Sequence, residues 1–168
     1  MRIAVSGTHR VGKSTLIDEF LRVHPEFGHE PEPYTVLVED FGEEFSAEPT
    51  VDDFVRQLEF NIDRLQQRAR EERVIFERCP IDFLAYISAL DPHAVQTLAG
   101  PALDAMHSLN LIVYLPLDET AITDAEFPKL RNAVDRRIRE MIYDNDYPLV
   151  EATGSTAERL RMIEQALT

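Results

Sequence analysis

Residues 7–14 read Gly-Thr-His-Arg-Val-Gly-Lys-Ser and fit the spacing G-x-x-x-x-G-K-[ST]. Glycine at the first and sixth positions lets the backbone curl, so that successive N–H groups point at one anion. Lys13 adds a mobile positive charge for the β and γ phosphates of a nucleotide, and the Ser14 hydroxyl is suited to ligating Mg²⁺. The segment therefore predicts a site for Mg²⁺ and for ATP or a similar nucleotide. The expected nucleotide contacts are Gly7, Thr8, His9, Val11, Gly12, Lys13, Ser14 and Thr15.

A chance match in a glycine-bearing loop is the alternative. With glycine at ~7% of residues, such a match arises in a chain of this length on the order of once in a hundred or less. The surrounding pattern also fits, because a strand is expected before the loop and a helix after it. The helix would direct the positive end of its dipole at the same anion. Within the loop, Arg10 either touches phosphate or is solvated.

Strand-like and helix-like segments alternate along the rest of the chain. Strands are expected over 2–6, 74–76, 111–115 and 149–150, and helices over 13–20, 51–69, 81–90, 94–109, 130–143 and from residue 155 on. Capping signals mark two of the helix starts, Thr50 with Asp53 and Ser155 with Glu158, and Gly100-Pro101 is interpreted as a break. The conformation of residues 31–49 is left open. Strands without clean polar alternation indicate a parallel sheet covered on both faces. We therefore predict one domain, 1–168, with an α/β fold: three α/β/α layers around a mostly parallel five-stranded sheet of the P-loop NTPase type.

The composition limits the partners. With 31 acidic and 17 basic residues the formal net charge is −14, so neither nucleic acid nor an anionic membrane is expected as a partner. The single cysteine, Cys79, rules out an internal disulfide and fits a reducing compartment. No apolar run is long enough to span a membrane, and the first residues do not resemble a signal sequence. A cytoplasmic protein is expected, and a homodimer stays open.

An acid and a base follow the expected strand 74–76. Because ligands of parallel sheets bind beyond the carboxyl ends of the strands, Glu77 is placed to hold Mg²⁺ through water. Arg78 is placed to pair with a substrate phosphate or with Glu77 itself. The alternative is an ordinary surface ion pair at a strand end. Asp82 either belongs to this site or caps the following helix.

With these motifs the chain resembles the P-loop kinases, in particular the thymidylate-kinase-like, deoxynucleoside-kinase-like and nicotinamide-riboside-kinase-like members. The resemblance extends over nearly the whole chain, although only the phosphate-binding loop is a specific motif. Three weaker matches support it: Glu-Pro-Glu-Pro at 30–33, Glu-Arg-Cys-Pro at 77–80 and Ala-Thr-Gly-Ser at 152–155. The last resembles the loop that packs near adenine, which implies that Thr153 and Gly154 contact the nucleotide.

The same resemblance implies roles for two further residues. Glu32, or Glu30 in the other register of the repeated Glu-Pro, would be the base or the contact to the accepting hydroxyl. Arg78 would hold the substrate. Cys79 stands where these kinases usually have a serine, and we interpret it as a small, unreactive residue.

P-loop kinases carry a mobile lid between the fourth and fifth strands, and its arginines close on the transferring phosphoryl group. The corresponding basic residues here are Lys129, Arg131, Arg136, Arg137 and Arg139. Arg131 and then Arg136 are the candidates for catalysis, because positive charge stabilises the phosphoryl oxygens in the transition state. The alternative is a solvated helix face. Since 118–127 contains acids but no arginine, the lid, at about 118–137, is expected to be short.

These features predict a kinase that moves the γ-phosphoryl of ATP to a small acceptor, a nucleoside or a nucleotide. The helix from Val51 would line the acceptor pocket, with Gln57 and Asn61 placed to contact a base edge. The alternative is a stand-alone regulatory ATPase or nucleotide-dependent switch without a small-molecule acceptor. A GTPase is disfavoured, because no Asn-Lys-x-Asp sequence occurs.

Overall fold

A five-stranded sheet forms the centre of the computed structural model, which describes residues 1–118 and 127–167. The strands are β1 (Arg2–Ser6), β2 (Gly28–Glu30), β3 (Val74–Glu77), β4 (Leu111–Tyr114) and β5 (Leu149–Glu151). Their order is β2-β3-β1-β4-β5, and every neighbouring pair is parallel. The predicted α/β architecture with a parallel sheet is therefore confirmed.

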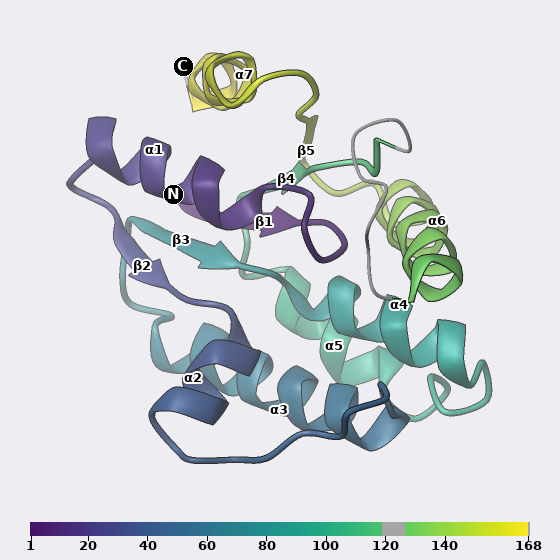
Figure 1. Ribbon diagram of the computed structural model, residues 1–168. Coiled ribbons are helices and arrows are strands. Elements are labelled where there is room, and N and C mark those ends of the chain that lie inside the picture. Colours follow the sequence, from purple (N-terminus) through teal and green to yellow (C-terminus); the bar gives the residue numbers. More distant parts are fainter. Residues whose placement is uncertain (119–126, 168) are drawn as a thin grey trace.

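Helices cover both faces of this sheet, as Figure 1 shows. They are α1 (Lys13–Val23), α2 (Pro33–Glu39), α3 (Val51–Gln67), α4 (Pro80–Leu90), α5 (Ala99–Met106), α6 (Pro128–Asp144) and α7 (Thr156–Leu167). Helices α1 and α7 lie on one face, and the other helices lie on the opposite side (Figure 1). The three predicted layers result.

The side chains of each strand point alternately to the two faces of the sheet, so the hydrophobic core has one part on each face. Ile3 and Val5 of β1 pack with Ile17 of α1 and Ile163 of α7. Ala4, between them, packs on the other side with residues of α4 and α6. Successive strand side chains point to opposite faces, so a strand buried on both faces must be apolar throughout. This explains why the strands lack polar alternation.

Both capping boxes expected from the sequence are present. The Asp53 backbone N–H donates to Thr50 Oγ1 at 3.3 Å, and the Thr50 N–H donates to Asp53 Oδ2 at 3.2 Å. At the start of α7, the Ser155 N–H donates to Glu158 Oε2 at 2.8 Å. These local bonds satisfy N–H groups that have no partner inside a helix.

The helix expected over 94–109 is shorter in the structure. The chain forms turns up to residue 98, and α5 runs only over Ala99–Met106. Asp91 begins these turns, because its Oδ1 accepts from the His93 N–H at 2.9 Å. Pro101, which we read as a break, lies in the first turn of α5, where a missing N–H costs no hydrogen bond.

Other boundaries moved less. Helix α1 continues to Val23 rather than ending near residue 20, and the open stretch 31–49 contains the short helix α2. No helix of the described residues is long and apolar enough to cross a bilayer. Of the expected lid at 118–137, residues 119–126 lie outside the described residues, and residues 128–137 form the first part of α6.

Candidate active site

The loop between β1 and α1 has a backbone that needs glycine at two positions. Gly7 has a φ of 146°, and a Cβ there would lie 2.7 Å from the Leu115 carbonyl oxygen. Gly12 has a φ of 93°. L-residues rarely adopt these conformations, so the two glycines of the motif fix the curl of the loop. The geometry of the loop therefore explains the spacing of its two glycines, which argues against a chance match to the motif.

Lys13 lies at the first position of α1 with its side chain inside the loop. Its Nζ donates to the Thr8 carbonyl at 2.8 Å, and the residue is buried. Burial, together with the nearby charge of Arg78, lowers the pKa of the Lys13 ammonium to about 8. A desolvated cation of this kind gains most from an anion placed beside it.

Two side-chain oxygens of a kind that suits a metal ion meet between the first turn of α1 and the end of β3. The Ser14 hydroxyl donates to Glu77 Oε1 at 2.7 Å, and Glu77 is buried at the last position of β3. Hydroxyl and carboxylate oxygens suit Mg²⁺, which binds through one or two protein ligands together with phosphate oxygens and water. The residues present therefore fit the ion that the sequence predicted.

Arg78 occupies a strained and buried position directly after β3. Its φ is 76°, in the left-handed region that residues with a side chain seldom adopt. The guanidinium pairs with Glu32, donates to the Gly7 carbonyl at 3.0 Å and lies 3.6 Å from Asp82 Oδ1. The alternatives of a surface ion pair and of a pair with Glu77 were wrong, because Arg78 is buried and its partners Glu32, Gly7 and Asp82 come from other elements.

Asp82 is both a cap and part of the site. Its carboxylate accepts from the Cys79 N–H at 2.9 Å, as in a capping box of α4, and from the Gly7 N–H at 2.9 Å. Cys79 is buried, and burial together with Asp82 raises the pKa of its thiol well above the usual value. The thiol is therefore protonated, in line with the unreactive residue we expected.

The two glutamates of the repeated Glu-Pro have different environments. Glu30 is buried and accepts from Arg64 at 2.7 and 2.9 Å and from Arg68 at 3.0 Å, so its charge is compensated within the scaffold. Glu32 lies two residues further on, directly before α2, and pairs with Arg78. Burial opposes its ionisation, but the charges of Arg78 and Lys13 outweigh burial and lower the pKa of Glu32.

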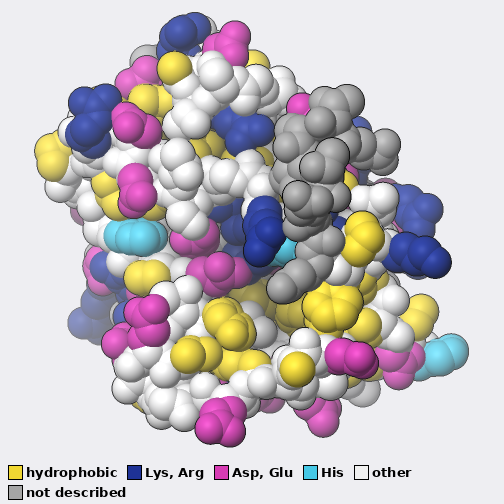
Figure 2. All heavy atoms as spheres, viewed as in Figure 1, with side chains coloured by type: hydrophobic (Ala, Val, Ile, Leu, Met, Phe, Trp, Pro, Cys, Tyr) yellow, Lys and Arg dark blue, Asp and Glu magenta, His cyan; other side chains and the backbone are white. Residues whose placement is uncertain are grey.

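Two adjoining cavities meet at the carboxyl edge of the sheet. The phosphate-side cavity, about 480 Å³, is lined by His9, Arg10, Gly12, Lys13, Ser14, Thr15, Glu32, Glu77 and Arg78. The second cavity, about 390 Å³, is called the acceptor-side cavity after the pocket expected from the sequence. It is lined by His9, Glu32, Tyr34, Phe45, Ser46, Ala47, Pro49, Asp53, Phe54, Gln57, Arg78, Tyr86, Phe127 and Leu130. His9, Glu32 and Arg78 belong to both. In Figure 2 charged side chains gather near the middle of this face, above a hollow with hydrophobic side chains.

Aromatic rings form much of the acceptor-side cavity. Phe54 and Tyr86 stack with their ring centroids 4.4 Å apart, and the ring centroids of Tyr34 and Phe45 are 5.2 Å apart. Gln57 is buried in the lining and donates to the Asp53 carbonyl at 3.2 Å. Flat apolar walls with a few polar groups are typical of sites for planar ligands. Asn61, the other expected base contact, is buried but does not line this cavity.

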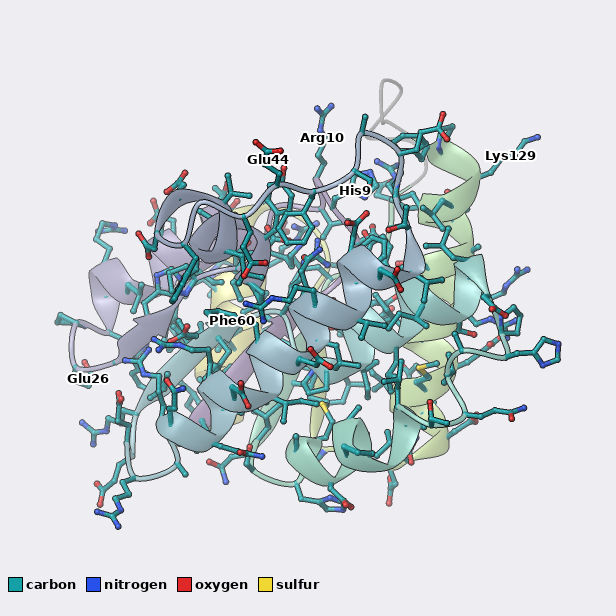
Figure 3. All side chains as sticks on the ribbon, turned by 90° about the horizontal axis from the view of Figure 1, so that it is seen from below. His9, Arg10, Glu26, Glu44, Phe60 and Lys129 are labelled. Atoms are coloured by element: carbon teal, nitrogen blue, oxygen red, sulfur yellow. The ribbon has the colours of Figure 1, made fainter. Side chains whose placement is uncertain are left out.

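The phosphate loop touches the aromatic wall through His9. The Tyr86 hydroxyl lies 3.2 Å from the His9 backbone nitrogen and 3.0 Å from Nδ1. Figure 3 shows His9 turned toward neighbouring side chains, whereas Arg10 points out from the loop. Tyr86 was not predicted from the sequence, because nothing in an apolar helical segment distinguishes it from a core residue.

The expected lid arginines differ in position. Arg131 is 3% exposed, and its Nε and Nη1 have no hydrogen-bond partner among the described residues. Arg136 is exposed, and neither Arg131 nor Arg136 lines either cavity. Lys129 points away from the molecule in Figure 3. Arg137 pairs with Glu140 at 2.9 Å, as expected of a solvated helix face.

Thr153 and Gly154, expected near the base, line a cavity on the other side of the loop. It measures about 430 Å³ and also includes Pro116, Leu117 and Arg159. Arg159 comes from α7 and donates to the Val11 carbonyl at 2.8 Å. No sequence signal singled out Arg159, because nothing in a helical pattern indicates a partner 148 positions away.

The parallel sheet, the glycine-determined loop and the Lys13, Ser14 and Glu77 cluster define a P-loop nucleotide-binding domain with the fold of the nucleoside and nucleotide kinases. The chain belongs to the AAA domain family, whose sequence model matches residues 2–159. A comparison with curated proteins finds no match.

Solved structures share this fold at low sequence identity. A deoxyadenosine kinase from M. mycoides is 18% identical with a TM-score of 0.65, covering 99% of this chain and 98% of its own. A thymidylate kinase from Ehrlichia chaffeensis is 13% identical with a TM-score of 0.68, covering 98% and 97%. The NadR protein in complex with NR is 13% identical with a TM-score of 0.70; the match covers 98% of this chain but only 51% of NadR.

Proposed function

We propose that this protein is an ATP-dependent kinase that transfers the γ-phosphoryl group to a small planar acceptor. The observation that carries the proposal is that the acceptor-side cavity and the phosphate-side cavity meet at Glu32 and Arg78. An acceptor hydroxyl in one cavity would then face the terminal phosphate in the other, and catalysis of phosphoryl transfer is mostly a matter of such positioning.

The residues of the loop would hold the nucleotide. Lys13 would move from the Thr8 carbonyl to the β and γ phosphates, and Thr153 and Gly154 would lie against the base. Ser14 and Glu77 would hold Mg²⁺, directly or through water. Bound there, the ion would neutralise charge on the phosphate oxygens.

Glu32 would act on the acceptor. Its carboxylate is ionised, and among the described residues only Arg78 bonds to it, through Oε1. Oε2 would take the proton of the acceptor hydroxyl as the new O–P bond forms and the bond to the leaving ADP oxygen breaks. Arg131, buried without a partner among the described residues, would supply charge to the transferring group.

The charges around the cavity favour a nucleoside over a nucleotide as acceptor. Glu32 and Asp53 are acids, and Arg78, the one arginine or lysine among the described residues of the lining, already faces two carboxylates. A phosphate on the acceptor would need cations to replace its hydration. The aromatic walls suit a base, as do the acceptors named in the titles of similar folds: a deoxyadenosine kinase and NadR bound to NR.

ADP release from ATP and Mg²⁺ tests the proposal against nucleosides, deoxynucleosides, nicotinamide riboside and the corresponding monophosphates. We expect stimulation of at least about tenfold by one nucleoside, little by its monophosphate, and none in Lys13→Ala. Stimulation by a monophosphate alone would contradict the assigned acceptor class but leave a kinase. Uniformly slow hydrolysis would contradict the kinase and favour the regulatory ATPase.

A further inference from the structure

The C-terminal helix reaches the phosphate loop through one side chain. Arg159, in the first turn of α7, donates from Nη1 to the Val11 carbonyl at 2.8 Å. The same nitrogen lies 3.2 Å from where a Cβ of Gly12 would stand. The guanidinium is thus packed directly against the Val11–Gly12 peptide, on the side of the loop that faces α7.

This contact is not explained by charge compensation. Arg159 makes no salt bridge with a carboxylate among residues 1–118 and 127–167, and its Nε is buried there without a hydrogen-bond partner. A partly buried guanidinium group without a counter-charge loses part of its hydration, so a purely structural role would cost free energy. An anion bound nearby would reduce this cost.

Because the Val11–Gly12 peptide is planar, the contact with Arg159 also fixes the direction of the Gly12 N–H. In a trans peptide the C=O of one residue and the N–H of the next point in opposite directions. A bond that holds the Val11 carbonyl toward α7 therefore holds the Gly12 N–H away from α7. Gly12 lines the phosphate-side cavity, into which the N–H groups of such a loop must point.

We propose that Arg159 is a positioning residue for phosphate binding, which fixes the Val11–Gly12 peptide so that the Gly12 N–H faces the nucleotide phosphates. Arg159 also lines the cavity with Thr153 and Gly154, so that the side chain holding the loop also borders the expected base. The inference rests on the nucleotide site of the proposed function, but it does not depend on any acceptor.

Binding of ATP and of tripolyphosphate, which has no base, measured by calorimetry, tests this role. Arg159→Gln is expected to weaken both about tenfold, the loss of one hydrogen bond from a charged donor. Arg159→Lys, which keeps the charge and one donor, should recover part of the loss. Arg161→Gln, an exposed neighbour on α7, removes the same charge and should change neither. Circular dichroism verifies that each variant is folded.

Unchanged tripolyphosphate binding in Arg159→Gln would overturn the proposal, even if ATP binding fell, because Arg159 would then act on the base alone. An equal loss in Arg161→Gln would overturn it in favour of general charge attraction. If the wild type binds ATP but no acceptor stimulates turnover, the kinase assignment fails. The binding measurements on Arg159→Gln and Arg161→Gln then still test the role of Arg159. A wild type that binds neither probe overturns both.

Discussion

The Asp82 carboxylate accepts a hydrogen bond from the Gly7 backbone N–H at 2.9 Å, joining the first turn of α4 to the first residue of the phosphate loop. Its other oxygen accepts from the Cys79 N–H, also at 2.9 Å. One fully buried side chain of α4 thus connects the segments that follow β1 and β3, and it lies 3.6 Å from Arg78, which borders both cavities. The cap of a helix is here also a support of the nucleotide site.

We expect Asp82→Ala to lower the free energy of unfolding by about 3 kcal/mol, because it leaves the buried N–H groups of Gly7 and Cys79 without their acceptor and removes one of the two carboxylates that face Arg78. Asp53→Ala removes the matching acid of an exposed capping box and should cost only about 1 kcal/mol. Urea unfolding of both variants measures the difference. Equal costs would show that the Gly7 bond adds nothing to an ordinary cap.

Glu32→Gln should lower kcat by ~10²–10⁴-fold, since the amide cannot take the proton of an acceptor hydroxyl. Glu30→Gln alters the neighbouring carboxylate of the same Glu-Pro repeat, which is occupied by Arg64 and Arg68. It should reduce stability and leave kcat of the folded protein nearly unchanged. Turnover with the best acceptor, measured beside thermal unfolding, separates the two; a greater loss of kcat in Glu30→Gln would reverse the assignment.

Arg131→Met is expected to change stability and activity in opposite directions. Removing a buried guanidinium that has no partner in the described chain should stabilise the protein by about 1 kcal/mol. It should also lower kcat by ~10³-fold, the order found when a transition-state arginine is lost. The control is Arg136→Met, an exposed change on the same helix. Its free energy of unfolding should lie within about 0.5 kcal/mol of wild type. If Arg136→Met alone loses kcat, Arg136 is the catalytic arginine.

The affinity for ATP should fall as the pH rises above about 8. Burial lowers the pKa of Lys13 to about 8 in the free protein, and a bound triphosphate would raise it again. Binding then takes up a proton above pH 8, and the affinity falls by at most about tenfold per pH unit. Titrations from pH 7 to about 10 measure this slope. In Lys13→Gln the binding should be weak and the slope absent; a wild-type slope in that variant would implicate another group.

The sequence alone determined the features that depend on near neighbours in the chain. The phosphate loop requires its two glycines within six positions, and the capping boxes at Thr50 and Ser155 close over three. Strands apolar throughout indicated a sheet buried on both faces. These predictions were confirmed because turns, caps and burial periodicity are set by local backbone geometry and by solvent exclusion.

Only the tertiary structure decided which side chains meet. Arg78 was expected to pair with Glu77 or a phosphate, but the fold brings it to Glu32, 46 positions away. Arg131 was placed near a helix start, and packing put it on the buried face. Arg159 lies 148 positions from the carbonyl it holds. Such contacts depend on how helices pack across the sheet, and no pattern of neighbouring residues encodes that distance in space.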